Sequence, residues 1–177
     1  MVRPTDATNR AANVKVMIFD VDGVLTDGSL TYAADGEITK TFYVLDGLGI
    51  QLLNKTGVAT AIISARNSPI VVKRAHDLGI KHVYQGIHDK RIAFAKLMEE
   101  TGATREQCGY IGDDVIDLPL LLQVGFAVTV PTGHPEVQHR VHYVTKNPGG
   151  RGAVREVCDM LMRAQGTYES ALAQYFA

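Results

Sequence analysis

The sequence predicts an α/β domain built on a doubly wound, Rossmann-like parallel sheet, with helices on both faces and an inserted β-hairpin flap. Short apolar, β-branched runs alternate with amphipathic segments of helical length. Several of these runs end abruptly in Asp, Ser or Gly-Asp, and no repeat or linker divides the 177 residues. We therefore expect one domain over residues 14–166 with a hairpin at about 28–43, and flexible tails at 1–13 and 167–177.

Composition excludes several classes of protein. Hydrophobic residues make up 46% of the chain, as in a globular protein, and the net charge of −1 gives no electrostatic argument for a nucleic-acid partner. No apolar run is long enough to span a bilayer, and the residues before Val14 lack the apolar core of a signal peptide. We expect a cytoplasmic protein without a membrane contact. Cys108 and Cys158 lie in apolar segments and are expected to be buried thiols, with a disulfide as the less favoured alternative.

The first of the apolar runs, Val14 to Phe19, is typical of a buried parallel strand. Asp20 and Asp22 follow it and point the same way if the chain stays extended. Two like charges at one strand end repel each other unless a cation or a shared proton lies between them. Gly23 then allows a sharp turn, so the stretch predicts a site for a hard cation such as Mg²⁺. The alternative is an ordinary turn, where Asp is common.

The elements after this stretch follow from turn and cap signals. A hairpin is indicated by alternating residues on either side of Asp35-Gly36, and its apolar residues fit either a partner-facing arm or a flap folded on its own core. A helix is expected from Asp46 to Thr56. Further helices are expected after Ser68, from Lys90 with Ile92, Phe94 or Ala95, and Met98 inside, and after Gly149-Gly150 with Val154, Val157, Cys158, Leu161 and Met162 inside. Further strands are expected at 58–63, 81–84, 107–111, 126–130 and 141–144.

Polar groups recur where the predicted strands end. Ser64 follows the second strand, and Asp113 and Asp117 follow a later one, while Lys90 begins a helix between them. The carboxyl ends of strands in a doubly wound sheet share one crevice, so these groups can converge. Carboxylates bind Mg²⁺, and a hydroxyl, a lysine and helix N-termini bind phosphate, which favours phosphoryl transfer. Taken singly, Ser64 could be a helix cap and Lys90 a surface residue.

The run Asp20-Val21-Asp22-Gly23-Val24-Leu25-Thr26-Asp27 resembles the first motif of the haloacid dehalogenase superfamily of phosphohydrolases. Ser64, Lys90 and the run Gly112-Asp113-Asp114-Val115-Ile116-Asp117 resemble its second, third and fourth motifs, in the same order. The hairpin, the lack of a cap domain and the run 149–156 resemble one family, the 3-deoxy-D-manno-octulosonate (Kdo) 8-phosphate phosphatases, over 14–166. A member would serve the biosynthesis of Kdo for lipopolysaccharide.

The resemblance implies a role for each motif residue. Asp20 would attack phosphorus and form an aspartyl-phosphate, and Asp22 would act as general acid and base. Ser64 and Lys90 would hold phosphate oxygens. Asp20, the backbone carbonyl of Asp22, and Asp113 would hold Mg²⁺. Asp117 would orient Lys90 or a metal-bound water.

The resemblance further implies substrate contacts and an assembly. Substrate would be contacted by Lys90 and by Tyr43, Val44, Leu45, Asp46, Gly47, Arg66 and Arg74, although the two arginines could equally be ordinary surface residues. Leu45 and Gln51 stand where relatives often carry arginine, so a phosphatase of a nine-carbon sialic-type sugar acid is an alternative. More distant alternatives are a phospho-receiver and a non-catalytic scaffold. The family implies a homotetramer in which one subunit's hairpin helps to close the next subunit's site.

Overall fold

The computed structural model describes residues 4–34 and 36–176. Asp35 of the predicted hairpin turn, residues 1–3 and residue 177 lie outside the described residues. The strands are β1 Val16–Phe19, β2 Thr31–Ala33, β3 Gly36–Thr39, β4 Ala59–Ile63, β5 His82–Tyr84, β6 Cys108–Ile111, β7 Phe126–Thr129 and β8 Tyr143–Val144. The α-helices are α1 Pro4–Ala12, α2 Val44–Lys55, α3 Pro69–Leu78, α4 Lys90–Thr101, α5 Leu118–Leu121, α6 Pro135–Gln138, α7 Ala153–Ala164 and α8 Tyr168–Leu172. Short 3₁₀ turns span Arg105–Gln107, Val115–Asp117 and Ala173–Tyr175.

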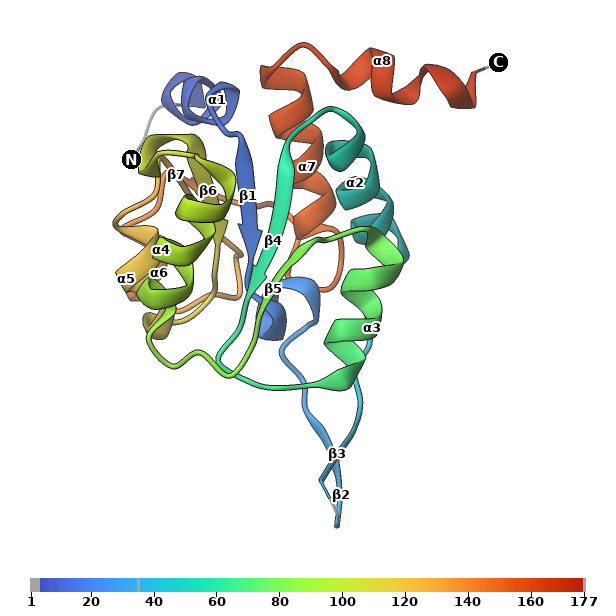
Figure 1. The fold of residues 1–177 in the computed structure, drawn as a ribbon, viewed down its shortest axis with the longest axis vertical. Helices are drawn as coiled ribbons and strands as arrows, with labels where there is room; N and C mark the ends of the chain where they lie inside the picture. The colour runs from blue at the N-terminus through green and yellow to red at the C-terminus, as the bar shows by residue number, and fades with distance from the viewer. Residues whose placement is uncertain (1–3, 35, 177) are drawn as a thin grey trace.

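Within the described residues, the main sheet has six parallel strands in the order β5-β4-β1-β6-β7-β8. Helices α2, α3 and α7 cover one face, and α4, α5 and α6 cover the other (Figure 1). This arrangement confirms the predicted doubly wound fold. The hairpin β2–β3 is confirmed as well, and it projects from the carboxyl end of the sheet (Figure 1).

The register of the central strand brings three strand ends together. Phe19 is paired with Ile62 of β4 on one side and with Ile111 of β6 on the other. The backbone N–H of Asp20 then donates to the carbonyl of Ile111 at 3.0 Å, which continues the ladder by one residue. Polar residues after β1, β4 and β6 therefore lie at one edge of the sheet, as the predicted topology requires.

Strand β1 supplies side chains to two separate cores. Met17 and Phe19 join the cluster under α2 and α7, and Val16 and Ile18 join the cluster under α4 and α5. Successive side chains of a strand point to opposite faces, and here both faces are covered, so the whole strand is apolar. Because β1 is buried on both faces, its position is fixed, and Asp20 is therefore held at the carboxyl end of the strand.

The two segments that we expected to be flexible tails are helical over most of their length. Residues 4–12 form α1, with Ala7 and Ala11 buried and Arg10 donating to the carbonyl of Gly125 at 3.0 Å. Small alanines bury little area each, so their spacing gives a weak sequence signal. At the other end, α8 follows α7, and the Arg163 guanidinium lies 3.5 Å from the centre of the Tyr168 ring.

The buried face of α4 also differs from the prediction. Lys90, Ala93, Phe94 and Leu97 face inward, whereas Ile92 is 68% exposed. Residues three, four and seven positions after Lys90 share its side of the helix. Because Lys90 is itself buried in an ionic network, its partners set the rotation of α4. By contrast, the predicted face of α7 is confirmed in all five of its residues.

Candidate active site

The turn that follows β1 is held by contacts with two distant loops. Gly23 has φ 85°, in the left-handed region that favours glycine, and a Cβ there would lie 1.9 Å from Oδ2 of Asp113. Gly150 donates to the carbonyl of Val24 at 2.9 Å, and a Cβ on Gly149 would lie 1.8 Å from the carbonyl oxygen of Gly23. We call residues 20–25, which carry the predicted catalytic groups Asp20 and Asp22, the catalytic loop. The two glycines before α7 therefore pack directly on this loop.

Lys90 lies between two carboxylates. Its Nζ is 2.8 Å from Oδ1 of Asp20 and 2.6 Å from Oδ1 of Asp117, and its side chain is 1% exposed. Burial by itself would lower the pKa of Lys90, but the two carboxylates outweigh burial and the pKa is raised. The side chain therefore stays charged and presents a positive group beside Asp20.

Asp117 organises the loop that follows β6. Its Oδ2 accepts the backbone N–H groups of Asp113 at 2.9 Å and Asp114 at 3.1 Å, and its Oδ1 accepts from Lys90. A Cβ on Gly112 would lie 2.5 Å from the carboxyl carbon of Asp117, so a larger residue would displace that carboxylate. Both oxygens of Asp117 are thus engaged inside the protein.

Asp20, Asp113 and Asp117 each offer an oxygen, and these atoms lie within 4.8 Å of one another. Since the oxygens of Asp117 are engaged elsewhere, Asp20 and Asp113 are the carboxylates that fit a cation. Burial, then Asp117, raises the pKa of Asp20 to about 7, although Lys90 opposes the shift. Burial, then Asp20, raises the pKa of Asp113 to about 7. Burial and the repulsion between neighbouring carboxylates both oppose ionisation here, and a bound divalent cation would offset both effects, so these oxygens suit Mg²⁺.

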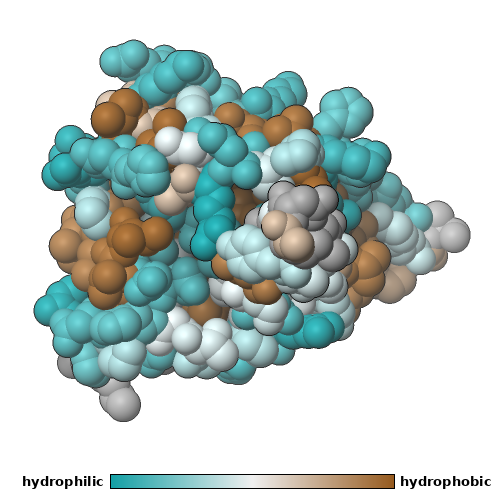
Figure 2. Space-filling model, turned by 90° about the horizontal axis from the view of Figure 1, so that it is seen from below, coloured by the Kyte–Doolittle hydropathy of each residue, from teal (hydrophilic) through white to brown (hydrophobic). Residues whose placement is uncertain are grey.

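A cavity of about 250 Å³ opens over this cluster. The view from the hairpin end shows hydrophilic and apolar groups interspersed around the protruding hairpin (Figure 2). The predicted catalytic residues Asp20, Asp22 and Ser64 all line the cavity, as do Asp113 and Arg66. Lys90 lies against Asp20 beneath it. The structure thus brings all four motifs together.

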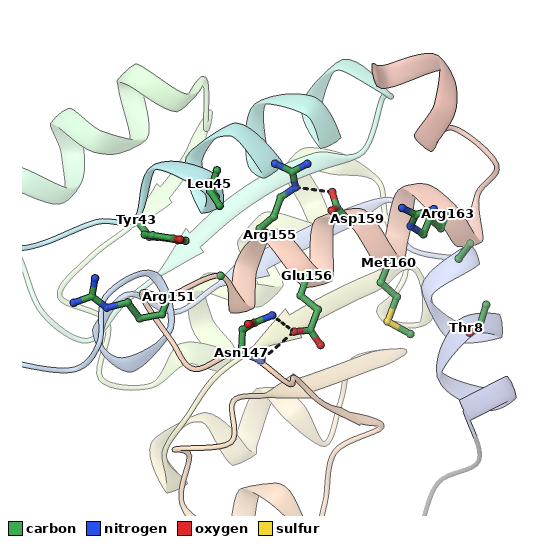
Figure 3. A pocket seen from close by; sticks show the side chains of 12 residues that line it. Thr8, Tyr43, Leu45, Asn147, Arg151, Arg155, Glu156, Asp159, Met160 and Arg163 are labelled. Atoms are coloured by element: carbon green, nitrogen blue, oxygen red, sulfur yellow. Dashed lines mark hydrogen bonds and ion pairs between the residues drawn. The ribbon is translucent and has the colours of Figure 1, made fainter. Parts of the chain in front are cut away.

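A larger groove of about 640 Å³ lies beside α7 (Figure 3). Tyr43 and Leu45, both predicted substrate contacts, line this groove and not the cavity over Asp20. Arg155 on the same groove is paired with Asp159 at 2.8 Å (Figure 3). In the single chain, the predicted substrate residues are therefore divided between two hollows.

The remaining predicted substrate residues lie away from the cavity over Asp20. Asp46 is 2% exposed, and its carboxylate accepts from the backbone N–H of Arg155 at 2.8 Å and of Gly152 at 3.3 Å. It therefore caps the start of α7. Arg74 donates to the carbonyl of Tyr43 at 3.4 Å and lies 2.4 Å from the Cβ position of Gly47. Val44 is 74% exposed.

Two residues of the site were not found from the sequence. Tyr110 is fully buried; its hydroxyl accepts from Lys90 at 2.9 Å and donates to Oδ1 of Asp117 at 2.5 Å. Lys40 Nζ lies 2.5 Å from Oδ1 of Asp22. A tyrosine in an apolar strand and a lysine in a hairpin carry no sequence signal of their own, because their partners are distant along the chain.

The fold and the site define the class of protein, and comparison with known proteins agrees. Residues 78–156 match the family model for haloacid dehalogenase-like hydrolases. A 3-deoxy-D-manno-octulosonate 8-phosphate phosphatase of Yersinia pestis is 46% identical over 94% of this chain and 89% of its own length. The chain belongs to the family of the 3-deoxy-D-manno-octulosonate 8-phosphate phosphatases.

Solved structures of relatives agree with this assignment. The Moraxella catarrhalis phosphatase, crystallised with a magnesium ion, a phosphate ion and a KDO molecule, matches with a TM-score of 0.94 at 40% identity over 98% of this chain and 99% of that one. A cobalt-bound phosphatase from Haemophilus influenzae matches with a TM-score of 0.89 at 44% identity over 94% and 98%. The predicted fold class and the prediction of a phosphatase are confirmed.

Two further expectations can be compared with the structure. Cys108 and Cys158 are buried free thiols, as predicted. None of the helices among residues 4–34 and 36–176 has the length and apolar character needed to cross a bilayer.

Proposed function

We propose that this chain hydrolyses the phosphomonoester of Kdo 8-phosphate, releasing Kdo and inorganic phosphate. The observation that carries the proposal is the position of Asp20, which lies at the end of β1 with Lys90 at 2.8 Å and with the Asp113 carboxylate close by. The Moraxella catarrhalis relative, crystallised with magnesium, phosphate and KDO, supports the substrate class.

In this reaction, an oxygen of Asp20 attacks phosphorus while the bond from phosphorus to the sugar oxygen breaks. Asp22 gives its proton to the departing oxygen, so that the sugar acid leaves as an alcohol. A water molecule then attacks the aspartyl-phosphate and loses a proton to Asp22, which restores both carboxyl groups. Lys90 and Ser64 hold phosphate oxygens throughout, with Lys90 kept charged by Asp20 and Asp117.

Mg²⁺ would be held by the carboxylates of Asp20 and Asp113 and by the backbone carbonyl of Asp22. When bound, the ion neutralises charge between the nucleophile and the phosphate. The donor set supports this assignment, because two acidic groups with a pKa of about 7 lie within 4.8 Å of each other.

Of the two predicted arginine contacts, Arg66 has the better position for the substrate. Arg66 lines the cavity over Asp20, whereas the Arg74 guanidinium lies over the Phe42 ring, 5.5 Å from its centre. A guanidinium can bind a sugar-acid carboxylate through paired hydrogen bonds. We infer that Arg66 contributes to recognition of the acid.

Phosphate release from Kdo 8-phosphate, from nine-carbon sugar-acid 9-phosphates and from a neutral hexose phosphate tests the proposal, each with Mg²⁺. We expect the highest kcat/KM for Kdo 8-phosphate, no turnover with chelator, and none for Asp20→Asn. A higher kcat/KM for a nine-carbon sugar-acid 9-phosphate would assign the chain to that related substrate class instead. Preference for the hexose phosphate would contradict a sugar-acid phosphatase.

We also infer a homotetramer in the cytoplasm, where a doubly charged phosphate ester would be retained by the membrane. Apolar groups near the site support an interface, because Tyr32 on the hairpin is 58% exposed and Ile116 beside the cavity is 51% exposed. Light scattering coupled to gel filtration should give four times the chain mass of 19.2 kDa. A monomer retaining full activity would contradict a site completed by a neighbour.

A further inference from the structure

We propose that Lys40, at the base of the hairpin, is a positioning residue that holds the carboxyl group of Asp22 in place for proton transfer to the leaving group. This inference rests on the proposed function, in which Asp22 is the general acid and base. It adds a task for the hairpin within a single chain, because Lys40 directly follows β3.

The contact between Lys40 and Asp22 is close and shielded. Lys40 Nζ lies 2.5 Å from Oδ1 of Asp22, and the lysine side chain is 1% exposed while that of Asp22 is 23% exposed. Burying a lysine ammonium is costly unless it is paired, so the pair constrains both side chains. The lysine side chain is thus buried against the catalytic loop.

A second cation approaches the other oxygen of Asp22. Arg66 Nε lies 3.5 Å from Oδ2, and its Nη1 donates to the hydroxyl of Tyr32 on β2 at 3.1 Å. Both sides of the hairpin are therefore connected to Asp22: Lys40, directly after β3, contacts it, and Tyr32 on β2 is linked to it through Arg66. The arginine side chain is 50% exposed, so its contact with Asp22 is weaker than that of the shielded lysine.

The catalytic loop leaves Asp22 in need of such support. Asp22 has an extended backbone conformation (φ −75°, ψ 121°) inside the turn Val21–Leu25, directly before the left-handed Gly23. The carboxylates of Asp20 and Asp117 are engaged by Lys90, whereas the contacts of the Asp22 carboxylate come from Lys40 and Arg66. General acid catalysis requires the proton donor within hydrogen-bond reach of the leaving oxygen, so loss of this orientation lowers the rate.

The leaving group distinguishes this task from other roles of a lysine. Departure of an alkoxide depends on protonation by Asp22, whereas p-nitrophenolate leaves readily without a proton. The leaving group of benzyl phosphate is an alkoxide similar in size to the p-nitrophenolate of p-nitrophenyl phosphate. Neither molecule carries a carboxylate. The ratio of their kcat/KM values therefore reports on Asp22 without any sugar-acid contact. The parameter kcat/KM covers steps up to the first departure and excludes hydrolysis of the aspartyl-phosphate, which is common to both substrates.

The experiment measures kcat/KM for both test phosphates and for Kdo 8-phosphate, each with Mg²⁺, in the wild-type chain and in Lys40→Met, Lys40→Arg, Asp22→Asn and Lys73→Met. Lys73 serves as the matched control, because it is an exposed lysine of α3 that pairs with Asp77 and makes no contact with Asp22. We expect Lys40→Met to lower kcat/KM for benzyl phosphate by about tenfold or more, a part of the full general-acid contribution, with little change for p-nitrophenyl phosphate. Lys40→Arg should recover much of the loss, and Lys73→Met should match the wild type.

Three outcomes would overturn the inference. An equal loss for both phosphates would indicate a purely structural lysine. A loss confined to Kdo 8-phosphate would indicate a contact with the sugar acid. Unchanged values in Lys40→Met, with Asp22→Asn strongly impaired on benzyl phosphate, would show that Asp22 needs no such support. Failure of the wild-type chain to hydrolyse Kdo 8-phosphate would instead contradict the proposed function, and this can be distinguished because the two test phosphates report on chemistry alone.

Discussion

Gly23 and Asp113 are in contact across the site: the position of a Cβ at residue 23 lies 1.9 Å from Oδ2 of Asp113. Gly23 of the first motif and Asp113 of the fourth are thus packed so closely that no methyl group fits between them. The same contact places the Asp113 carboxylate beside the turn that carries Asp22, which is the arrangement that a shared metal ion requires.

Gly23→Ala should weaken Mg²⁺ binding by about tenfold or more, because the new methyl group displaces the Asp113 carboxylate. Isothermal titration calorimetry and the Mg²⁺ dependence of activity measure the effect. Gly57→Ala is a matched control, since Gly57 has a similar φ of 92° but open space around its Cβ position. Equal Mg²⁺ affinities in the two variants would show that the contact with Asp113 does not control binding of the metal.

Binding of Mg²⁺ should strengthen as pH rises through 7. Asp20 and Asp113 each have a pKa of about 7 in the folded chain, against an ordinary value of 3.8. Between these values the metal-free folded state holds protons that the unfolded chain has lost, so its free energy of unfolding falls as pH rises. Mg²⁺ requires the ionised carboxylates, so the increase in Tm that it causes should be larger above pH 7 than below. If the increase in Tm caused by Mg²⁺ depends on pH in the wild type but not in Asp113→Asn, then Asp113 is the group whose ionisation limits binding. An increase in Tm that does not depend on pH in the wild type would contradict the prediction.

Tyr110→Phe should lower kcat by about tenfold while the chain remains folded. The substitution removes the hydroxyl that joins Lys90 to Asp117 and leaves both charged groups to reorganise in a buried setting. Steady-state kinetics and thermal unfolding measure the two effects. Tyr84→Phe removes a hydroxyl that bonds Glu100 on the surface, and it should leave kcat unchanged. If both variants behave alike, the buried hydroxyl does not position Lys90.

Asp46→Ala should lower the free energy of unfolding by about 1–2 kcal/mol, because it removes the cap from the start of α7. Chemical denaturation measures this loss. The predicted role of Asp46 in substrate binding gives a different expectation, namely a raised KM at unchanged stability. Leu45→Ala serves for comparison, since Leu45 lies one residue earlier and lines the groove beside α7.

Several parts of the site could be predicted because a local pattern specifies them. An apolar run that ends in Asp20-Val21-Asp22-Gly23 already identifies a buried strand followed by acidic groups and a sharp turn. The prediction that Asp113 joins Asp20 needed only the rule that parallel strands present their carboxyl ends at one edge. The α7 face followed from helical periodicity, since Val154, Val157 and Leu161 are all apolar.

The predictions that failed depended on partners distant in sequence. Ile92 was expected inside α4 because it is apolar, yet the ionic contacts of Lys90 turn that side of the helix outward. The helix α1 gave little signal, because the buried residues Ala7 and Ala11 are small. The capping of α7 by Asp46 joins residues more than a hundred positions apart, which no local pattern reveals.

By itself the sequence determined the alternation of strands and helices, the order of the four motifs and the chemical character of the site, because each depends on neighbouring residues or on a general rule of parallel sheets. The tertiary structure alone decided which charged groups pair: Lys90 with Asp20 and Asp117, Lys40 with Asp22, and Asp46 with the start of α7. Pairing inside a protein depends on distances of a few ångströms between atoms. Those distances are fixed only when the strands, the hairpin and the helices have packed together.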